Sequence, residues 1–106
     1  MTIGSGSSQW QPTPDGNPGT FWKPVSLDTI QAPYRAALWR GVAGKYDRPR
    51  GMPWSEVFTV SAGKGRVRFE SEVVEMAPGV TIELRKGVPY IFEIDEQLEK
   101  FAIIRD

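Results

Sequence analysis

The feature that most constrains the fold is a series of short apolar segments in the second half of the chain, separated by turn-forming residues. Arg66–Glu70 alternates strictly between polar and apolar side chains, which is the period of a half-buried β-strand. The predicted strands here are Ser55–Ser61, Arg66–Glu70, Glu72–Met76, Thr81–Leu84, Pro89–Ile94 and Lys100–Arg105. The predicted connections are turns at Ala62–Gly65, Ala77–Gly79 and Arg85–Gly87, and an acidic loop at Asp95–Glu99. Short strands with this spacing predict an all-β fold, an antiparallel sandwich or barrel.

The first part of the chain is predicted to be a loosely ordered arm over residues 1–19, followed by a single β-barrel domain over residues 20–106. The arm is rich in Gly, Ser, Pro, Gln and Asn, which bury too little apolar surface to offset the entropy of ordering. Trp10 is the exception, and we expect it to tether the arm to a neighbouring surface.

Ordered structure is expected to begin at Thr20–Val25. Ser26–Gln31 is interpreted either as one turn of helix or as an irregular connection. Tyr34–Val42 is predicted as a strand that places Arg35, Ala37 and Trp39 on one face. A helix is the alternative for this segment, because Ala, Leu and Arg are good helix formers.

Composition excludes several classes of function. The 106 residues carry 13 basic and 13 acidic side chains, so no net charge favours nucleic acid or an anionic membrane as a partner. There is no cysteine, which excludes disulfides and thiolate chemistry and fits the reducing cytoplasm that we expect as the compartment. There is no histidine, the commonest metal ligand and general base. We see neither a signal peptide nor an apolar run long enough to span a bilayer.

One carboxylate, Glu56, stands inside an apolar predicted strand within the stretch Gly44–Gly63, which opens with a loop rich in Gly, Pro, Asp and Arg. Burial of an ionised carboxylate without a partner is costly. We therefore expect a cation, a metal ion or a ligand beside Glu56.

The same stretch resembles the first signature of the cupins, a family of small jelly-roll barrels. That signature is a glycine, five residues, His-x-His, three or four residues, a glutamate, six residues and a glycine. Gly44, Glu56 and Gly63 stand at its glycine and glutamate positions, while its two histidine positions hold Arg50 and Met52.

The second cupin signature is also partly present. Gly79 and Gly87 stand at its two glycine positions, whereas Arg85, Tyr90 and Ile94 replace its proline, histidine and asparagine. The resemblance covers Tyr34 to Asp106 and implies a single antiparallel jelly-roll β-barrel.

In metal-bearing cupins the three histidines and the glutamate hold a divalent ion, and this chain keeps only the glutamate. Arginine stays protonated, methionine is a soft ligand and a neutral phenol is a poor one. We therefore expect no metal and no cofactor. If the cupin register holds, Arg50, Met52, Glu56 and Tyr90 point into the barrel, followed by Phe58, Val60 and Phe92 at the strand period.

An inward arginine beside an inward glutamate has two interpretations. On the first, Arg50 and Glu56 form a salt bridge that plugs the barrel. On the second, Arg50 binds an anionic ligand, while Glu56 and Tyr90 act as acid/base or hydrogen-bonding groups. On the second interpretation the catalytic candidates are Glu56 and Tyr90. The ligand-binding candidates are Arg50, Met52, Trp39, Trp54, Phe58 and Phe92, although any one of these aromatic side chains also fits a core role.

Two classes of function follow. One is a metal-independent small-molecule-binding cupin that acts as an isomerase, epimerase, lyase or cyclase on a small organic acid, sugar or secondary metabolite. The other is a non-catalytic ligand-binding module, or a dimeric structural or regulatory module with a plugged barrel. An open pocket with a raised Glu56 pKa would favour the enzyme. The sequence leaves the choice between enzyme and binding module open. Because small cupins commonly pair through their sheets, we expect a homodimer.

Overall fold

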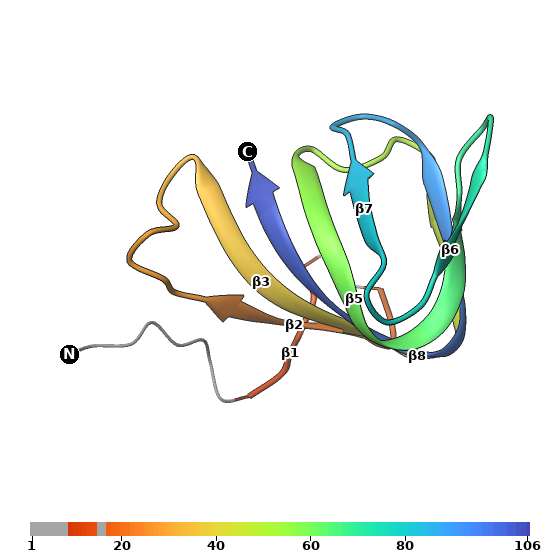
Figure 1. Ribbon diagram of the computed structural model, residues 1–106, viewed down its shortest axis with the longest axis horizontal. Helices are drawn as coiled ribbons and strands as arrows, with labels where there is room; N and C mark the ends of the chain where they lie inside the picture. Colours follow the sequence, from red (N-terminus) through yellow and green to blue (C-terminus); the bar gives the residue numbers. More distant parts are fainter. Residues whose placement is uncertain (1–8, 15–16) are drawn as a thin grey trace.

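The computed structural model describes residues 9–14 and 17–106, and every regular element in these ranges is a β-strand (Figure 1). The strands are β1 Gln11–Pro12, β2 Thr20–Val25, β3 Tyr34–Gly41, β4 Gly44–Arg48, β5 Ser55–Arg68, β6 Val73–Met76, β7 Thr81–Leu84 and β8 Tyr90–Arg105. The all-β prediction is confirmed. No helix long and apolar enough to cross a membrane occurs in the described residues.

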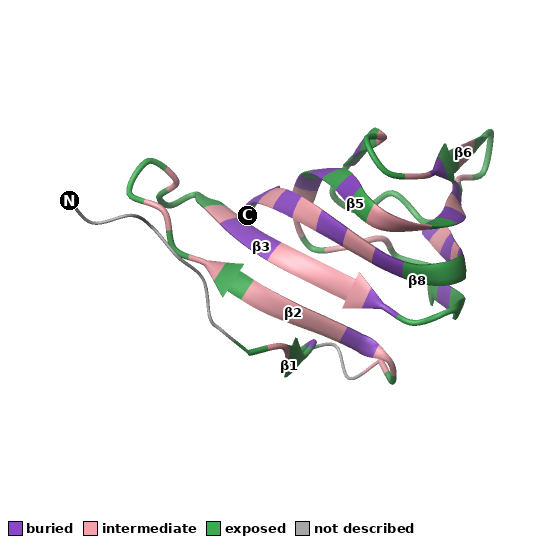
Figure 2. Ribbon diagram, turned by 60° about the horizontal axis from the view of Figure 1, so that its bottom comes forward, coloured by how far each residue is buried: buried purple, intermediate pink, exposed green. Residues whose placement is uncertain are grey.

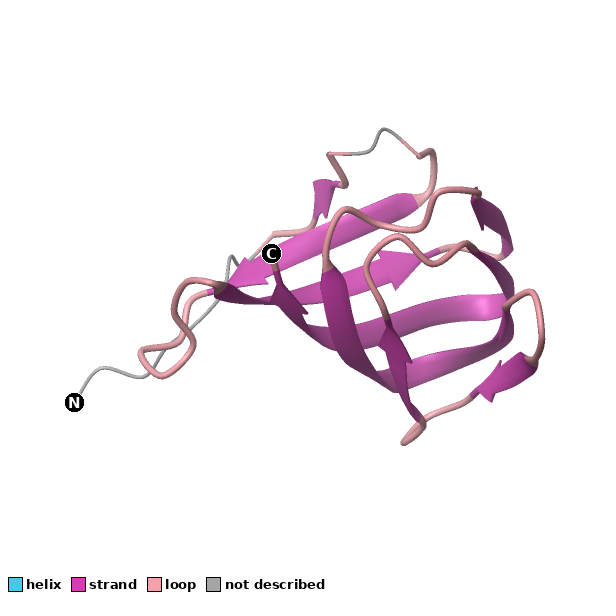
Figure 3. Cartoon of the chain, turned by 90° about the horizontal axis from the view of Figure 1, so that it is seen from above, coloured by secondary structure: helices cyan, strands magenta, loops and turns pink. Residues whose placement is uncertain are grey.

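All pairings are antiparallel, in the order β1-β2-β3-β8-β5-β6, with β4 also on β8 and β7 also on β5. The two long strands β5 and β8 lie at the centre and bend, so the part of the sheet formed with β4, β6 and β7 curls round an interior (Figures 1 and 3). β3 pairs with the edge of β8 opposite β5, the same edge on which β4 pairs with the first half of β8, and β2 and β1 extend the sheet beyond β3.

The predicted strand at Tyr34–Val42 is present as β3, so the helical alternative is wrong. Ser26–Gln31 contains no helical turn, and its one regular feature is an isolated bridge between Leu27 and Ile30. The Gly/Pro/Asp/Arg segment that was predicted as a loop begins with a strand, β4, which pairs with the first half of β8 through Tyr46 and Phe92.

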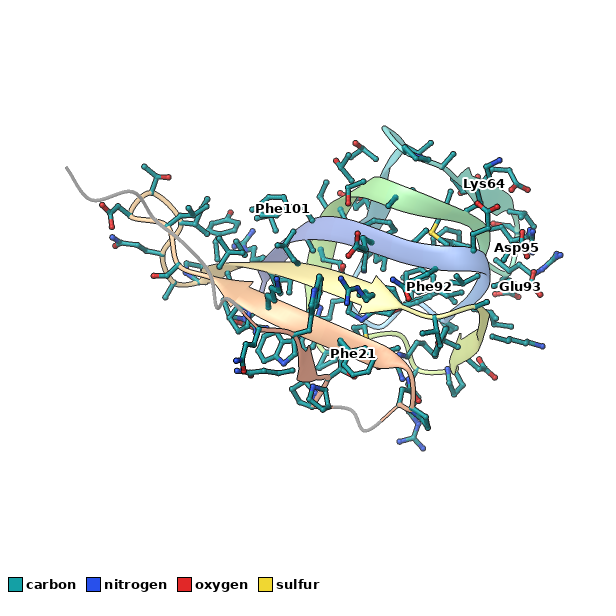
Figure 4. The ribbon with its side chains drawn as sticks, turned by 90° about the horizontal axis from the view of Figure 1, so that it is seen from below. Phe21, Lys64, Phe92, Glu93, Asp95 and Phe101 are labelled. Atoms are coloured by element: carbon teal, nitrogen blue, oxygen red, sulfur yellow. The ribbon has the colours of Figure 1, made fainter. Side chains whose placement is uncertain are left out.

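The predicted turn at Ala62–Gly65 and the predicted loop at Asp95–Glu99 are both wrong. They are the bends of β5 and β8, and they pair with each other with several register shifts. Gly63 has φ +91°, and a Cβ atom there would lie 2.2 Å from the carbonyl oxygen of Gln97. The glycines therefore permit a bulge and a close backbone approach inside a continuous strand. Lys64, Glu93 and Asp95 lie together at this end of the sheet (Figure 4).

Alternate residues of the long strands face the interior, which gives the striped burial pattern of Figure 2. Near the bend the interior is filled by the fully buried side chains Val60, Val67, Met76 and Leu98. Away from the bend the inward residues include two charged groups, Glu56 and Lys100, and two alanines, Ala37 and Ala102. The barrel is thus packed with apolar side chains at one end and more open at the other.

The described part of the N-terminal arm joins the sheet. β1 pairs with β2, and the centroid of the Trp10 ring lies 4.8 Å from Lys23 Nζ and 4.2 Å from Arg40 Cζ. These contacts agree with the expected tethering role of Trp10. The rest of the arm, residues 1–8 and 15–16, lies outside the described residues.

Candidate functional site

The more open end of the barrel holds a cavity of about 180 Å³. Its walls come mainly from the inner faces of β3, β4, β5 and β8 and from the segment before β5. Aromatic side chains dominate the lining: Trp22, Trp39, Tyr46, Trp54, Tyr90 and Phe92. The charged side chains in the lining are Arg35, Arg48, Glu56 and Lys100.

The cavity exists because two small residues meet on its wall. Ala37 of β3 and Ala102 of β8 are register partners, and both line the cavity. Larger inward residues precede and follow them along β8, at Lys100 and Ile104. The small side chains of the alanine pair therefore leave the space that a ligand can occupy, because larger side chains at paired positions of neighbouring strands would fill it.

The polar centre of the cavity is an ion pair between Glu56 and Lys100. Lys100 Nζ donates to Glu56 Oε2 at 2.8 Å, and the two side chains are only 6% and 5% exposed. Trp54 Nε1 donates to the other carboxylate oxygen at 3.1 Å. Both carboxylate oxygens are therefore hydrogen-bonded, as a buried charge requires.

Three aromatic rings surround the ammonium group. Lys100 Nζ lies 4.1 Å from the ring centroid of Phe58 and 5.1 Å from those of Trp39 and Phe92. Ring faces attract a cation electrostatically, and more strongly where water is excluded. The rings and the carboxylate together stabilise the charged lysine in the barrel interior.

The net effect on Glu56 is a lowered pKa. Burial of the carboxyl group raises the pKa, but the charge of Lys100 and the hydrogen bonds from Lys100 and Trp54 lower it by more. Glu56 is therefore a carboxylate at neutral pH, which is the opposite of the raised pKa expected of a catalytic acid.

The salt bridge between Arg50 and Glu56, one of the two interpretations of the sequence, is wrong. Arg50 is exposed in the connection between β4 and β5 and does not line the cavity, and Lys100 takes its place. The cupin register places a metal-ligand position at Arg50, but in this chain that residue lies in the connection before β5 and not on an inward-facing strand position. The available signal for Lys100 was its alternation with Ala102 and Ile104, together with the requirement of Glu56 for a cation.

The other sequence candidates divide into two groups. Six of them line the cavity together: Trp39, Met52, Trp54, Glu56, Tyr90 and Phe92. Phe58 is fully buried and touches Lys100 but lies outside the lining, so its position is that of a core residue. Binding and catalytic roles for all of these residues stay predictions.

Arg35 is a charged residue that the sequence candidates omitted. It starts the inward row of β3, and Nε and Nη2 each donate to a carboxylate oxygen of Asp106 at 2.7 Å. Its Cζ lies 5.1 Å from the centroid of the Trp54 ring. With side chains 40% and 55% exposed, Arg35 and Asp106 form the solvent-facing counterpart of the buried pair.

The residues around Glu56 do not fit a divalent metal ion. Within the described ranges no group of three or more His, Cys, Asp and Glu side chains is placed to hold one. The one carboxylate present already has an ammonium group at 2.8 Å. The expectation of a metal-free site stays a prediction, tested below by elemental analysis.

Comparison with known proteins gives the fold. No protein-family model matches the chain, and no curated protein matches it in sequence. Among solved structures, a DUF1255 protein of unknown function from Acidithiobacillus ferrooxidans aligns with TM-score 0.74 and 17% identity over 96% of this chain and 92% of its own. The EutQ protein of Clostridium difficile aligns with TM-score 0.67 and 15% identity, over 89% and 75% of the two chains.

The salicylate 1,2-dioxygenase of Pseudaminobacter salicylatoxidans aligns with TM-score 0.71 and 22% identity over 90% of this chain, which spans only 28% of that enzyme. Similarity at these identities concerns the fold alone. The chain has an all-β, cupin-like jelly-roll fold, as its glycine and glutamate spacing predicted.

Proposed function

We propose that this protein is a small-molecule-binding barrel whose cavity takes a ligand about the size of one aromatic ring. The observation that carries the proposal is the aromatic cavity, with six aromatic side chains in its wall and the Glu56–Lys100 pair at its centre. A concave apolar site with a few placed polar groups is the usual form of a ligand pocket.

The size of the cavity limits the ligand. Its volume is about 180 Å³. Apolar protein cavities of about 150 Å³ bind benzene, whereas drug-sized ligands occupy about 300–1,000 Å³. A single ring with one small substituent is therefore the class of ligand that fits.

The ion pair favours binding without turnover. Glu56 is held as a carboxylate by Lys100 and Trp54, so it has no proton to give at neutral pH and is a weak base. Glu56 and Tyr90 both line the cavity, which is the observation that supports the catalytic alternative, a metal-free isomerase, lyase or cyclase. In that case the confined cavity would act mainly by positioning the substrate.

Two further elements belong to the proposal. A cytoplasmic setting agrees with the cysteine-free sequence. A homodimer is supported by apolar side chains on the outer face of the central strands, where Val57 is 44% exposed and Phe101 projects from β8 (Figure 4). Sedimentation equilibrium measures the oligomeric state directly.

The binding proposal is tested with benzyl alcohol and benzoate as probes, titrated into the protein while amide chemical shifts and tryptophan fluorescence are recorded. We expect saturable shifts at cavity residues. Ala102→Leu fills the cavity and should abolish them, whereas Ala43→Leu, at an exposed loop position, should not. The proposal fails if neither probe causes saturable shifts, or if the two leucine variants bind the probes equally well.

A further inference from the structure

We infer that the natural ligand carries a carboxylate that binds the Arg35 guanidinium at the edge of the cavity, in competition with Asp106. This inference rests on the proposed function and names the chemical class of its ligand. It follows from the charges in the cavity wall, from the partners that these charges already have, and from the geometry of the Arg35–Asp106 pair.

The charges of the wall favour an anion. Among the described residues, the cavity lining contains the cationic side chains of Arg35, Arg48 and Lys100 and the carboxylate of Glu56. In a cavity walled by low-dielectric aromatic groups, an excess of positive charge attracts a negative group more strongly than it would in open water.

Lys100 is not the cation that receives this negative group. Its ammonium is 2.8 Å from Glu56 Oε2 and lies within 5.1 Å of the centroids of three aromatic rings. An anion placed against Lys100 would therefore also lie close to the Glu56 carboxylate and be repelled by it. Two negative charges in contact in a buried site repel each other strongly, so binding of an anion there is unfavourable.

Arg35 has the position that an anion can reach. Its side chain is 40% exposed, against 5% for Lys100, and it lines both the cavity and the shallower hollow beside the β2–β3 connection. Its guanidinium lies over the Trp54 ring at 5.1 Å. An aromatic face under the guanidinium fixes its plane while leaving its edge available for hydrogen bonds.

The Arg35–Asp106 pair shows that this edge accepts a carboxylate. Nε and Nη2 donate to the two oxygens of Asp106 at 2.7 Å each, the forked geometry in which arginine recognises carboxylates. Exposed ion pairs of this kind contribute little to stability, so a ligand displaces the Asp106 side chain at small cost. The two Nη1 protons lie outside the pair and offer a second point of contact.

A ligand seated in this way has its ring in the aromatic cavity and its carboxylate at Arg35. Benzoate is the minimal probe for this arrangement, and benzamide is its neutral counterpart of the same shape. The inference predicts that benzoate binds at least about tenfold more tightly than benzamide, as expected for a charge-assisted hydrogen bond.

Two substitutions test the residue. Arg35→Gln should reduce benzoate affinity to that of benzamide and leave benzamide affinity unchanged. Arg40→Gln is the matched control, because Arg40 lies on the same strand but faces outward, where it pairs with Glu99 at 2.8 Å. Asp106→Asn removes the competing carboxylate and should raise benzoate affinity about two- to fivefold without affecting benzamide.

The outcomes separate this inference from the proposal on which it depends. If benzamide and benzoate bind equally and Ala102→Leu abolishes both, the cavity binds ligands but the assignment of a carboxylate to Arg35 is overturned. Equal losses of benzoate affinity in Arg35→Gln and Arg40→Gln overturn it as well. If neither compound binds, the proposed function itself fails.

Discussion

Lys100 Nζ of β8 lies 2.8 Å from Glu56 Oε2 of β5, and both side chains are almost fully buried. The two residues are 44 positions apart in the sequence, and the pairing of β5 with β8 brings them together. The pair satisfies the need of a buried carboxylate for a cation without a metal ion. Substitutions in this pair test how much it contributes to the unfolding free energy of the protein.

Removal of the carboxylate charge should be strongly destabilising. Glu56→Gln leaves Lys100 buried without a counter-ion, which typically costs about 3–5 kcal/mol of unfolding free energy. Urea denaturation measures this. Glu83→Gln, at a glutamate of β7 whose side chain is 56% exposed, is the control and should change the unfolding free energy by under about 0.5 kcal/mol.

The double variant Glu56→Gln/Lys100→Met distinguishes a lost charge pair from a packing defect. Because it removes both charges, it should recover a large part of the stability lost in Glu56→Gln. A Glu56→Gln variant as stable as the original protein would contradict the importance of the pair.

The lowered pKa of Glu56 sets the direction of its pH dependence. The folded state binds a proton at Glu56 less readily than the unfolded state, whose pKa is near the ordinary value of 4.5. The stability that this group contributes is therefore fully present above that value and is lost as pH falls towards the folded pKa. Denaturation curves between about pH 7 and about pH 3 should show this loss, and the double variant should show less of it.

Sequence patterns predicted the fold better than they predicted the site. Strand alternation and the spacing of Gly44, Glu56 and Gly63 were enough for an all-β, cupin-like barrel. β4 was missed because its residues K-Y-D-R are mostly polar, and its place in the sheet depends on pairing with β8. Glycines suggested a turn within β5, since the sequence does not distinguish a bulge from a reversal of the chain.

The site was predicted in part. The cupin register predicted the inward position of Glu56, and the strand period added Phe58 and Phe92; all three side chains are buried. The prediction that Arg50 points into the barrel was wrong, because Arg50 lies before β5 and the alternation of side chains along a strand does not extend to it. Lys100 and Arg35 lie near Glu56 because β8 pairs with both β5 and β3. No local sequence pattern shows which strands become neighbours in the sheet.

Trp10 should hold the described part of the arm against the sheet. Trp10→Ala removes the ring that contacts Lys23 and Arg40, and each exposed cation–π contact contributes about 0.5–1 kcal/mol. We expect faster proteolysis within the arm and little change in global stability. Trp10→Phe should retain part of the protection, and equal proteolysis of all three proteins would contradict the tethering role.

Protein purified without chelators should contain no stoichiometric transition metal. Among the described residues Glu56 is the one acidic group in the cavity wall, and it is already paired with Lys100. Inductively coupled plasma mass spectrometry provides the measurement, and incubation with Zn²⁺ or Mn²⁺ should not raise the thermal midpoint. A bound ion at one equivalent would contradict the prediction.

Two glycines with nearly equal positive φ angles should respond differently to substitution. Gly63 and Gly79 have φ +91° and +92°, but a Cβ at Gly63 would lie 2.2 Å from the Gln97 carbonyl oxygen, whereas a Cβ at Gly79 would meet nothing within 4 Å. Gly79→Ala should therefore cost only the conformational strain, about 1 kcal/mol. Gly63→Ala adds a backbone clash at the bend shared by β5 and β8 and should cost about 3 kcal/mol or more. Urea denaturation of the two variants compares them, and equal losses would show that the bend tolerates a side chain.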